Sequence, residues 1–403
     1  MELSSTDTGQ RRRFEPVNGH VGVYVCGVTP YDTTHVGHLF TFASFDVLIR
    51  YLRHLGITVT YVQNVTDVDD DMMRKANELG TTWQALADDQ VGQLVADMEG
   101  LNIALPDHFP RASNQIGVIL PMVERLVRQG RAYAANGSVY YDVRAEAEFG
   151  PPSDLADYAS MLAVANERGN TPDDTNKRDP LDFILWQQSA PGEPWWESPW
   201  GPGRPGWHIE CSAMSYRYLG PTVDIHGGGY DLVFPHHACE RVQSERYTGV
   251  LPFVRFWLHA GMVRLAGEKM SKSLGNLVLA RHLLQEYPAN AIRLALANHH
   301  YREEWDWEAA DLPAMREWDR TFAQALLPRP DGDVPLAVLP ALQQKVLDGI
   351  DDDLNTPVAI QSLLELAHAI LAAPTTTDLQ AGQRILRDLA GVFGLRYPEV
   401  AVA

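Results

Sequence analysis

A pattern of strand, helix and strand near the start of the chain most limits what it can fold into. Residues 20–28, HVGVYVCGV, form a continuous apolar run that is typical of a buried strand. Residues 38–56 carry apolar side chains at helical spacing up to Gly56, and residues 57–67 form a second strand-like run. Units of this kind build parallel sheets through right-handed crossovers. The pattern predicts an α/β fold with a parallel sheet covered by helices.

Both predicted strands are followed by unusually polar stretches. These are CGVTPYDTTHVGH at 26–38 and NVTDVDD at 64–70. In open α/β sheets, ligands bind beyond the carboxyl ends of the strands. We therefore expect a binding site where these two stretches meet.

The chain has 403 residues, enough for two or three domains. We divide it into a first catalytic half at 1–104, an inserted connective region at 105–205, a second catalytic half at 206–310 and a helical bundle at 311–403. The inserted region combines a helix (114–130), a hairpin (134–143) and a Pro/Gly-rich run (192–207). Strand-like runs resume at 206–214, 222–234 and 254–265, and amphipathic helical patterns follow at 336–350, 357–373 and 379–394.

The formal net charge of -19 argues against a broad electrostatic footprint on a nucleic acid, although a local basic groove remains compatible with it. Solubility alone explains such acidity. The N-terminus carries no apolar signal region, and no stretch approaches the length of a spanning helix. We expect a cytoplasmic protein without a membrane partner, and a monomer by default.

Three cysteines, Cys26, Cys211 and Cys239, are too few and too scattered for a disulfide framework. Core packing, a nucleophile or a metal site remain as their possible roles. His236 and Glu240 in FPHHACE stand one helical turn apart, on one face. Together with Cys26 and Cys211 they make a candidate zinc set, although their spacing matches no zinc-finger pattern. From these residues alone, buried cysteines beside a surface histidine and glutamate are an equal alternative.

Two further motifs carry chemistry in combination. His35 and His38, in HVGH, stand at the start of the predicted helix, where the helix dipole favours an anion. Lys269 and Lys272, in KMSKS at 269–273, add positive charge on a loop with small flanking residues. Such charges stabilise phosphoryl oxygens as pyrophosphate leaves.

In this order and separation, the motifs resemble the HIGH and KMSKS signatures of the class I aminoacyl-tRNA synthetases. The resemblance implies a Rossmann-like catalytic domain that uses ATP with Mg²⁺ to form an aminoacyl-adenylate. It assigns catalytic roles to His35, His38, Lys269 and Lys272. The implied ATP-binding residues are His35, Gly37, His38, Lys269, Met270, Ser271, Lys272 and Ser273.

The stretches YVCG, NVTDVDD, GRPGWHIECSAM, DIHGGGYDL and FPHH are similar to the cysteine-activating branch of class I. In that branch a zinc ion in the pocket binds the thiol of the substrate, and cysteine is selected over serine without editing. The resemblance implies L-cysteine as substrate and Zn²⁺ held by Cys26, Cys211, His236 and Glu240. It implies cysteine contacts at Cys26, Gly27, Thr66, Trp207, His226, Gly228 and Asp231, with Asp67 near the amino group. Without it, Trp207 is interpreted as core packing and Cys239 as a bystander.

Two families share this catalytic domain: the cysteinyl-tRNA synthetases, and the mycothiol-pathway ligases that join cysteine to glucosaminyl-inositol. CGVTPYDTTHVGH, NLVLA, MLAVANERGNTPDD and AIRLALANHHYRE resemble the ligases, whereas Glu240, DIHGGG and GEKMSKSLGN resemble the tRNA enzymes. About 130 residues follow KMSKS, enough for a bundle but not for a further anticodon-recognising module.

We therefore expect cysteine transfer to the amine of glucosaminyl-inositol in mycothiol biosynthesis. A cysteine-tRNA ligase without the anticodon-binding module, acting on tRNA(Cys), is the alternative. A non-catalytic paralogue is a third hypothesis, against which the intact HVGH and KMSKS motifs count.

Overall fold

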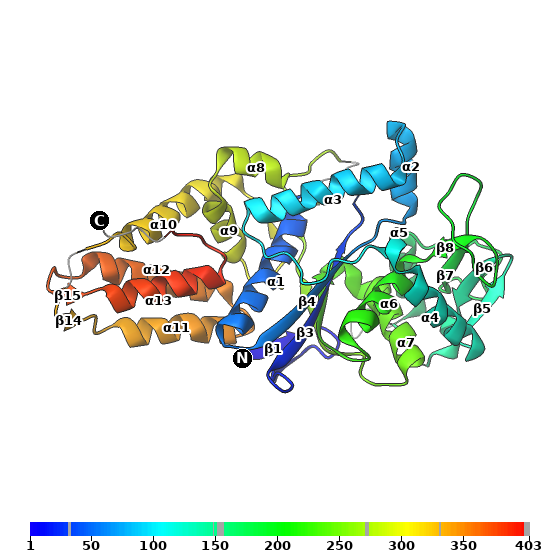
Figure 1. Cartoon of the computed structure of the whole chain (residues 1–403), viewed down its shortest axis with the longest axis horizontal. Coiled ribbons are helices and arrows are strands. Elements are labelled where there is room, and N and C mark those ends of the chain that lie inside the picture. The colour runs from blue at the N-terminus through cyan, green and yellow to red at the C-terminus, as the bar shows by residue number, and fades with distance from the viewer. Residues whose placement is uncertain (31–33, 148, 151–156, 271–273, 330–331, 399–403) are drawn as a thin grey trace.

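The computed structural model describes residues 1–30, 34–147, 149–150, 157–270, 274–329 and 332–398. Figure 1 shows a central sheet with helices on one side and a mixed helical and sheet region on the other. A bundle of helices lies at the far end of the body, where the chain finishes.

The central sheet is parallel and has the order β10, β9, β3, β4. Its strands are β3 (His20–Val28), β4 (Thr58–Val65), β9 (Val223–Gly229) and β10 (Val254–Ala260). Helix α1 (Val36–His54) connects β3 to β4, and most of its side chains are buried. The predicted α/β fold with a parallel sheet is confirmed, as are the two predicted strands and the helix between them.

Further elements precede β3 and follow β4 in the chain. A hairpin of β1 (Glu2–Ser5) and β2 (Gln10–Arg13) opens the chain. Helices α2 (Asp70–Leu79) and α3 (Trp83–Gly100) follow β4. Because α2 begins at the polar stretch after β4, its start lies at the carboxyl edge of the sheet (Figure 1).

The region of the predicted insertion forms a second, antiparallel sheet in the order β5, β6, β7, β8. Its elements are α4 (Ile116–Arg128), β5 (Ala132–Ala135), β6 (Ser138–Tyr141), α5 (Tyr158–Glu167), β7 (Phe183–Gln188) and β8 (Gly203–Pro205). Their apolar side chains form one core with those of α6 (Trp207–Leu219) and α7 (Ala238–Thr248). The inserted region therefore packs directly on two helices of the second half.

The strand expected at 206–214 is wrong, because these residues begin helix α6. Gly206 is the extended residue before its first turn. The helix lies between the inserted region and the central sheet, and Ile209, Cys211 and Ala213 are all buried. A helix that is covered on several sides has no polar face, so its sequence shows no period of 3.6 residues.

The second half continues into a small three-stranded sheet and then into helices. The strands are β11 (Val263–Leu265), β12 (Glu268–Lys269) and β13 (Trp305–Asp306), and the helices are α8 (Ala280–Glu286) and α9 (Ala289–Ala297). The bundle contains α10 (Leu312–Ala325), α11 (Leu339–Asp351), α12 (Thr356–Ala372) and α13 (Gln380–Val392), with the short strands β14 (Val334–Pro335) and β15 (Thr377–Asp378). Short helical turns lie at Ala112–Asn114, Val143–Ala145, Tyr230–Leu232, Val233–His237 and Ala309–Asp311.

The three amphipathic patterns predicted near the end of the chain correspond to α11, α12 and α13. The division into segments at 104, 205 and 310 stays a prediction. Within the described residues, none of the helices combines the length and apolar character needed to cross a membrane.

A buried ion pair joins helix α1 to helix α9 of the second half. Arg293 of α9 donates from Nη2 to Oδ2 of Asp46 at 2.6 Å, and both side chains are 1% exposed. The same guanidinium donates to the carbonyls of Phe393, Leu101 and Asn102. Each of the three guanidinium nitrogens therefore has an acceptor, as burial of such a charge requires.

Asp46→Ala should lower the free energy of unfolding by about 3–5 kcal/mol, because it leaves the Arg293 guanidinium buried without its counter-charge. Urea denaturation measures the change. Lys345→Ala is the matched control, since Lys345 and Glu365 form an exposed pair at 2.9 Å that contributes about 0–1 kcal/mol. Equal effects of the two substitutions would contradict the importance of the buried pair.

Candidate functional site

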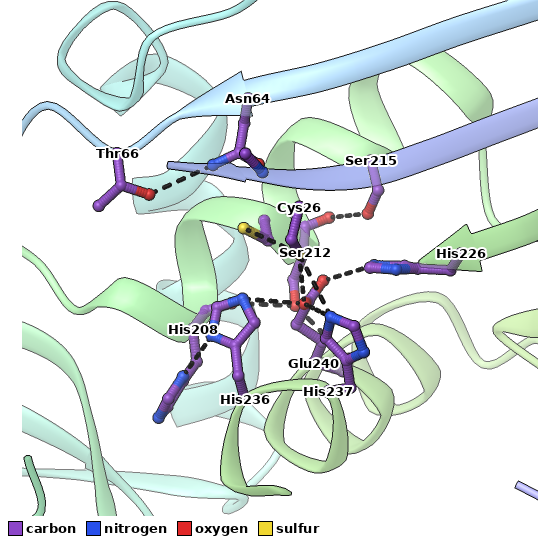
Figure 2. A network of polar contacts seen from close by, with 12 residues as sticks. Cys26, Asn64, Thr66, His208, Ser212, Ser215, His226, His236, His237 and Glu240 are labelled. Atoms are coloured by element: carbon purple, nitrogen blue, oxygen red, sulfur yellow. Dashed lines mark hydrogen bonds and ion pairs between the residues drawn. The ribbon is translucent and has the colours of Figure 1, made fainter. Parts of the chain in front are cut away.

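The predicted site residues gather beyond the carboxyl ends of β3 and β9. These strands are neighbours, with Tyr24 opposite His226. Cys26 lies on β3 and Cys211 on α6, while His236 lies in the turn Val233–His237 that leads into α7. Glu240 is in the first turn of α7. Three segments that are distant in sequence thus converge at one edge of the sheet (Figure 2).

Cys26, Cys211, His236 and Glu240 are all buried, and one ligand atom from each lies within 4.8 Å of the others. The two sulfur atoms are 3.9 Å apart, and Oε1 of Glu240 is 3.6 Å from the sulfur of Cys26 and 3.1 Å from Nε2 of His236. Nε2 of His236 forms an ion pair with Oε1 of Glu240 but makes no hydrogen bond of regular geometry among the described residues. A buried nitrogen that contacts a carboxylate and lies near two thiols fits a tetrahedral zinc site.

A second group shares two members of the first. Cys26, His226, His237 and Glu240 also bring one ligand atom each within 4.8 Å. Nε2 of His226 lies 3.0 Å from Oε2 of Glu240, and Nε2 of His237 lies 3.3 Å from the sulfur of Cys26. The first group contains two thiols where the second contains one, and thiolates bind zinc strongly. We therefore take the first group as the candidate metal site and His226 and His237 as its neighbours.

The electrostatics of the group favour the ionised forms of the Glu240 and Cys211 side chains. Burial raises the pKa of Glu240, but the charges and hydrogen bonds of His226 and His236 outweigh it and lower the pKa to about 2. Burial opposes ionisation of Cys211 as well, yet the hydrogen bond from Cys26 and the charge of His236 bring its pKa down to about 6. Burial raises the pKa of the neighbouring Cys26 well above its usual value, as does the nearby Cys211. One thiol is thus already poised to become a thiolate.

Aromatic and imidazole rings surround the candidate ligands. Trp207 stacks on His236 with ring centroids 4.3 Å apart, and Nδ1 of His208 lies 2.8 Å from Nδ1 of His236. Burial lowers the pKa of His208 to about 3, so the ring is neutral near pH 7. On the other side, Nδ1 of His237 lies 2.7 Å from Nε2 of His259. These contacts fix the orientation of the His236 and His237 rings. Residues that contact metal ligands usually orient them in this way.

The other residues predicted to contact cysteine lie around this group. The backbone nitrogen of Gly27 donates to Oδ1 of Asn64 at 3.0 Å, and Nδ2 of Asn64 donates to Oγ1 of Thr66 at 3.2 Å. Gly228 approaches Cys26, because a Cβ built there would lie 3.5 Å from the Cβ of Cys26. The carboxylate of Asp67 is engaged by Ser113, through its backbone nitrogen at 2.9 Å and its hydroxyl at 2.6 Å.

The histidine motif lies beside the chain that follows the lysine motif. His35 is the residue before α1, and its Nδ1 accepts from the backbone nitrogen of Gly37 at 3.0 Å. The rings of His35 and His38 are 4.0 Å apart. His35 also pairs as a β-bridge with Leu279, a few residues after the lysine motif. The chain after that motif is thereby placed against the start of α1.

Lys269 links the lysine motif to the residues that are predicted to contact cysteine. It lies in β12, and its Nζ is 3.7 Å from Oδ2 of Asp231, one of the residues predicted to contact cysteine. Met270 is buried. Ser271, Lys272 and Ser273 lie outside the described residues.

Comparison with known proteins agrees with this arrangement. Residues 13–317 match the family model of the class I (C) tRNA synthetase catalytic domain, and residues 345–397 match that of the DALR domain. The chain belongs to the class I aminoacyl-tRNA synthetases. It is therefore an enzyme of the AMP-forming ligase class, and the third hypothesis, a non-catalytic paralogue, has no support.

The relatives of this synthetase identify its branch. It is 44% identical over 402 residues to a cysteine–tRNA ligase of Alkalilimnicola ehrlichii, which covers 98% of this chain and 85% of that protein. The cysteine–tRNA ligases of Shewanella oneidensis and Escherichia coli are each 42% identical, over 98% of this chain and 85% of their own length.

Solved structures show the fold of the synthetase. Methionyl-tRNA synthetase of Mycobacterium tuberculosis, in complex with methionyl-adenylate, superposes with a TM-score of 0.63 at 17% identity, covering 93% of this chain and 88% of that chain. Arginyl-tRNA synthetase of Thermus thermophilus gives a TM-score of 0.59 at 17% identity, covering 96% and 83%.

The prediction of glucosaminyl-inositol as acceptor is wrong. The relatives at 42–44% identity over 98% of the chain are cysteine–tRNA ligases, and they favour the alternative. The stretches that suggested the sugar ligase lie in a catalytic domain that both families share, so they carry little information about the acceptor. The length argument also favoured the wrong acceptor, because cysteine–tRNA ligases match 98% of this chain. The DALR match at 345–397 begins within α11 and extends past α13, in a region that the sequence showed only as amphipathic helices.

Several functional neighbours were not found from the sequence. His208, His237 and His259 contact the candidate ligands or one another. The histidine doublet in FPHHACE was the available signal for His237. His208 and His259 come from separate segments, and neither stands in a pattern that links it to the others.

Cys211→Ser should remove most of the metal from the purified synthetase, because a hydroxyl is a far weaker zinc ligand than a thiolate. Elemental analysis by inductively coupled plasma mass spectrometry measures the bound zinc per chain. Cys239→Ala is the matched control, since Cys239 is also buried but belongs to neither group of candidate ligands. Unchanged zinc in both variants would remove the metal hypothesis.

Proposed function

We propose that this synthetase activates L-cysteine with ATP and transfers the cysteinyl group to tRNA(Cys), releasing pyrophosphate and AMP. The observation that carries the proposal is the buried group of two thiols, an imidazole and a carboxylate beside the HVGH helix. The cysteine–tRNA ligases that match 98% of the chain support the same substrates.

Zinc is the metal that suits the group, and Cys26, Cys211, His236 and Glu240 would hold it. When bound, zinc lowers the pKa of a thiol and prefers a soft thiolate to a hydroxyl, which favours cysteine over serine. The protein contributes the shape around that position. Trp207 stacks against His236 and closes one side, and Gly228 leaves room beside Cys26. The amino group of the substrate would then reach Thr66, Asp231 and the backbone of Gly27.

In the first half-reaction, a carboxylate oxygen of cysteine attacks the α-phosphorus of ATP. A new oxygen to phosphorus bond forms, and pyrophosphate leaves with the electrons of the bond that breaks. The start of α1 supplies backbone N–H groups and the rings of His35 and His38 for the phosphates. Lys269 and Met270, together with Ser271, Lys272 and Ser273 outside the described residues, would complete the ATP site, with Mg²⁺ on the phosphates.

In the second half-reaction, a ribose hydroxyl at the end of the tRNA attacks the carbonyl carbon of the adenylate. The ester bond forms, and AMP leaves with the mixed-anhydride oxygen. A cavity of about 870 Å³, lined by the inserted region and by residues of both catalytic halves, would give access, because Trp207 and His208 form part of its wall. No residue among those described is assigned as the base for this step.

The acceptor can be tested directly. Purified enzyme with ATP and cysteine should release AMP faster when a tRNA(Cys) transcript is added, and the cysteine should become acid-precipitable with the RNA. Glucosaminyl-inositol should give no stimulation over the reaction without acceptor. Stimulation by the amino-sugar, without transfer to tRNA, would contradict the proposal.

His38→Ala should lower kcat for cysteine-dependent pyrophosphate exchange by about 100-fold, as loss of one preorganised donor in a transition state does. The KM for cysteine should stay within about twofold, because the interaction is made with phosphate oxygens in the transition state. His54→Ala is the matched control, since His54 is the exposed last residue of the same helix. A similar loss in both variants would assign His38 to folding.

A further inference from the structure

The loop between β9 and α7 connects the two sides of the amino-acid site. It carries Asp231, which pairs with Lys269, and His236, a candidate metal ligand. Its backbone consists of two short turns, Tyr230–Leu232 and Val233–His237, interrupted at Phe234, whose φ of -142° and ψ of 137° are extended. An interruption of this kind leaves carbonyl groups without the regular partners of a helix.

An arginine of the inserted region occupies two of these carbonyls. Arg168 is the residue that ends α5, and its Nη1 donates to the backbone oxygens of Asp231 and Phe234. One acceptor lies in each turn, and the second belongs to Phe234, the residue of the interruption itself. A charged donor forms stronger hydrogen bonds than a neutral one, so a single guanidinium holds together the two turns of the loop.

Apolar contacts place the loop against the same region. The ring of Phe234 is buried and meets Phe149 of the inserted region edge-on, with centroids 6.0 Å apart. Phe234 and Ala238 belong to the core that contains α4 and the antiparallel sheet. The inserted region therefore contacts the loop through both polar and apolar groups.

We propose that Arg168 is a positioning residue of the amino-acid site. It acts through the loop, since its contacts are with the backbone of Asp231 and Phe234. By fixing these carbonyls it sets the place of the Asp231 carboxylate on one side and of His236 on the other. The inference rests on the proposed function, in which this loop serves the cysteine pocket.

The alternative is an ordinary surface arginine on the wall of the cavity. Arg168 is exposed and lines that cavity with Lys177 and Arg204. A solvated guanidinium there would need no particular partner. The two carbonyl acceptors, one in each short turn of the loop, distinguish Arg168 from such a residue.

Hydrogen exchange, followed by mass spectrometry, tests the contact without substrate or metal. Arg168→Ala should speed the exchange of backbone amides within 230–237 by about tenfold, because charge-assisted bonds that restrain the loop are lost. Arg168→Lys, which keeps a charged donor, should restore part of the protection. Arg144→Ala is the matched control, since Arg144 is an exposed arginine of the inserted region that pairs with Asp179 at 2.7 Å. Exchange in 230–237 that is the same in all variants would overturn the proposal.

Kinetics then separate positioning from mere packing. In cysteine-dependent pyrophosphate exchange, Arg168→Ala should raise the KM for cysteine by about tenfold and leave the KM for ATP within about twofold. Transfer of zinc to a chromogenic chelator should be faster by a similar factor, because the loop carries His236. Arg144→Ala should change neither quantity.

The outcomes also distinguish this inference from the proposed function. Faster hydrogen exchange with an unchanged KM for cysteine and unchanged zinc release would overturn the positioning role. If the unmodified enzyme catalyses no cysteine-dependent exchange, the proposed function fails. Zinc release and hydrogen exchange then still decide whether Arg168 controls the loop, and Arg168→Gln replaces Arg168→Ala if the alanine variant does not fold.

Discussion

The buried carboxylate of Glu240 is the group on which the arrangement of the site depends. An ionised carboxylate without solvent is stable only when other groups balance its charge. His226 and His236 do so, with Nε2 atoms at 3.0 and 3.1 Å, and the sulfur of Cys26 lies 3.6 Å from the same side chain. One carboxylate therefore ties together β3, β9, the loop after β9 and α7. Figure 2 shows the rings and sulfur atoms arranged around it.

The parallel sheet brings these groups to one edge, and its glycines allow them to come close. A Cβ at Gly27 would lie 1.7 Å from the carbonyl oxygen of Asn64, and one at Gly228 would lie 2.7 Å from the side chain of Leu232. A larger residue at Gly27 would collide with the backbone of β4, whereas one at Gly228 would meet the end of the flexible Leu232 side chain. The glycine of YVCG thus has a structural cause that is independent of substrate, namely the close approach of the end of β3 to β4.

Elements with one clear period were predictable from the sequence, and contacts between separate segments were not. Strands β3 and β4 and helix α1 between them were predictable, because their apolar residues follow strand and helix spacing in turn and turn residues separate them. Helix α6 was not predictable, because a helix that is buried on several sides has no polar face. Cys26, Cys211, His236 and Glu240 were chosen by their chemistry, and the structure brings them together. Arg168 does not stand in a sequence motif of metal ligands or catalytic side chains. Its partners are backbone carbonyls, which no pattern of side chains reveals.

The error over the acceptor has a physical lesson of its own. A net charge of -19 was taken as weak support for a small acceptor over a polyanion. Net charge is a sum over the whole surface, whereas an acceptor meets only the groups around its path. The wall of the cavity beside Trp207 mixes Arg168, Lys177 and Arg204 with the acidic residues Asp69 to Asp71. Because this one wall carries charges of both signs, the total charge of the chain says little about what enters there.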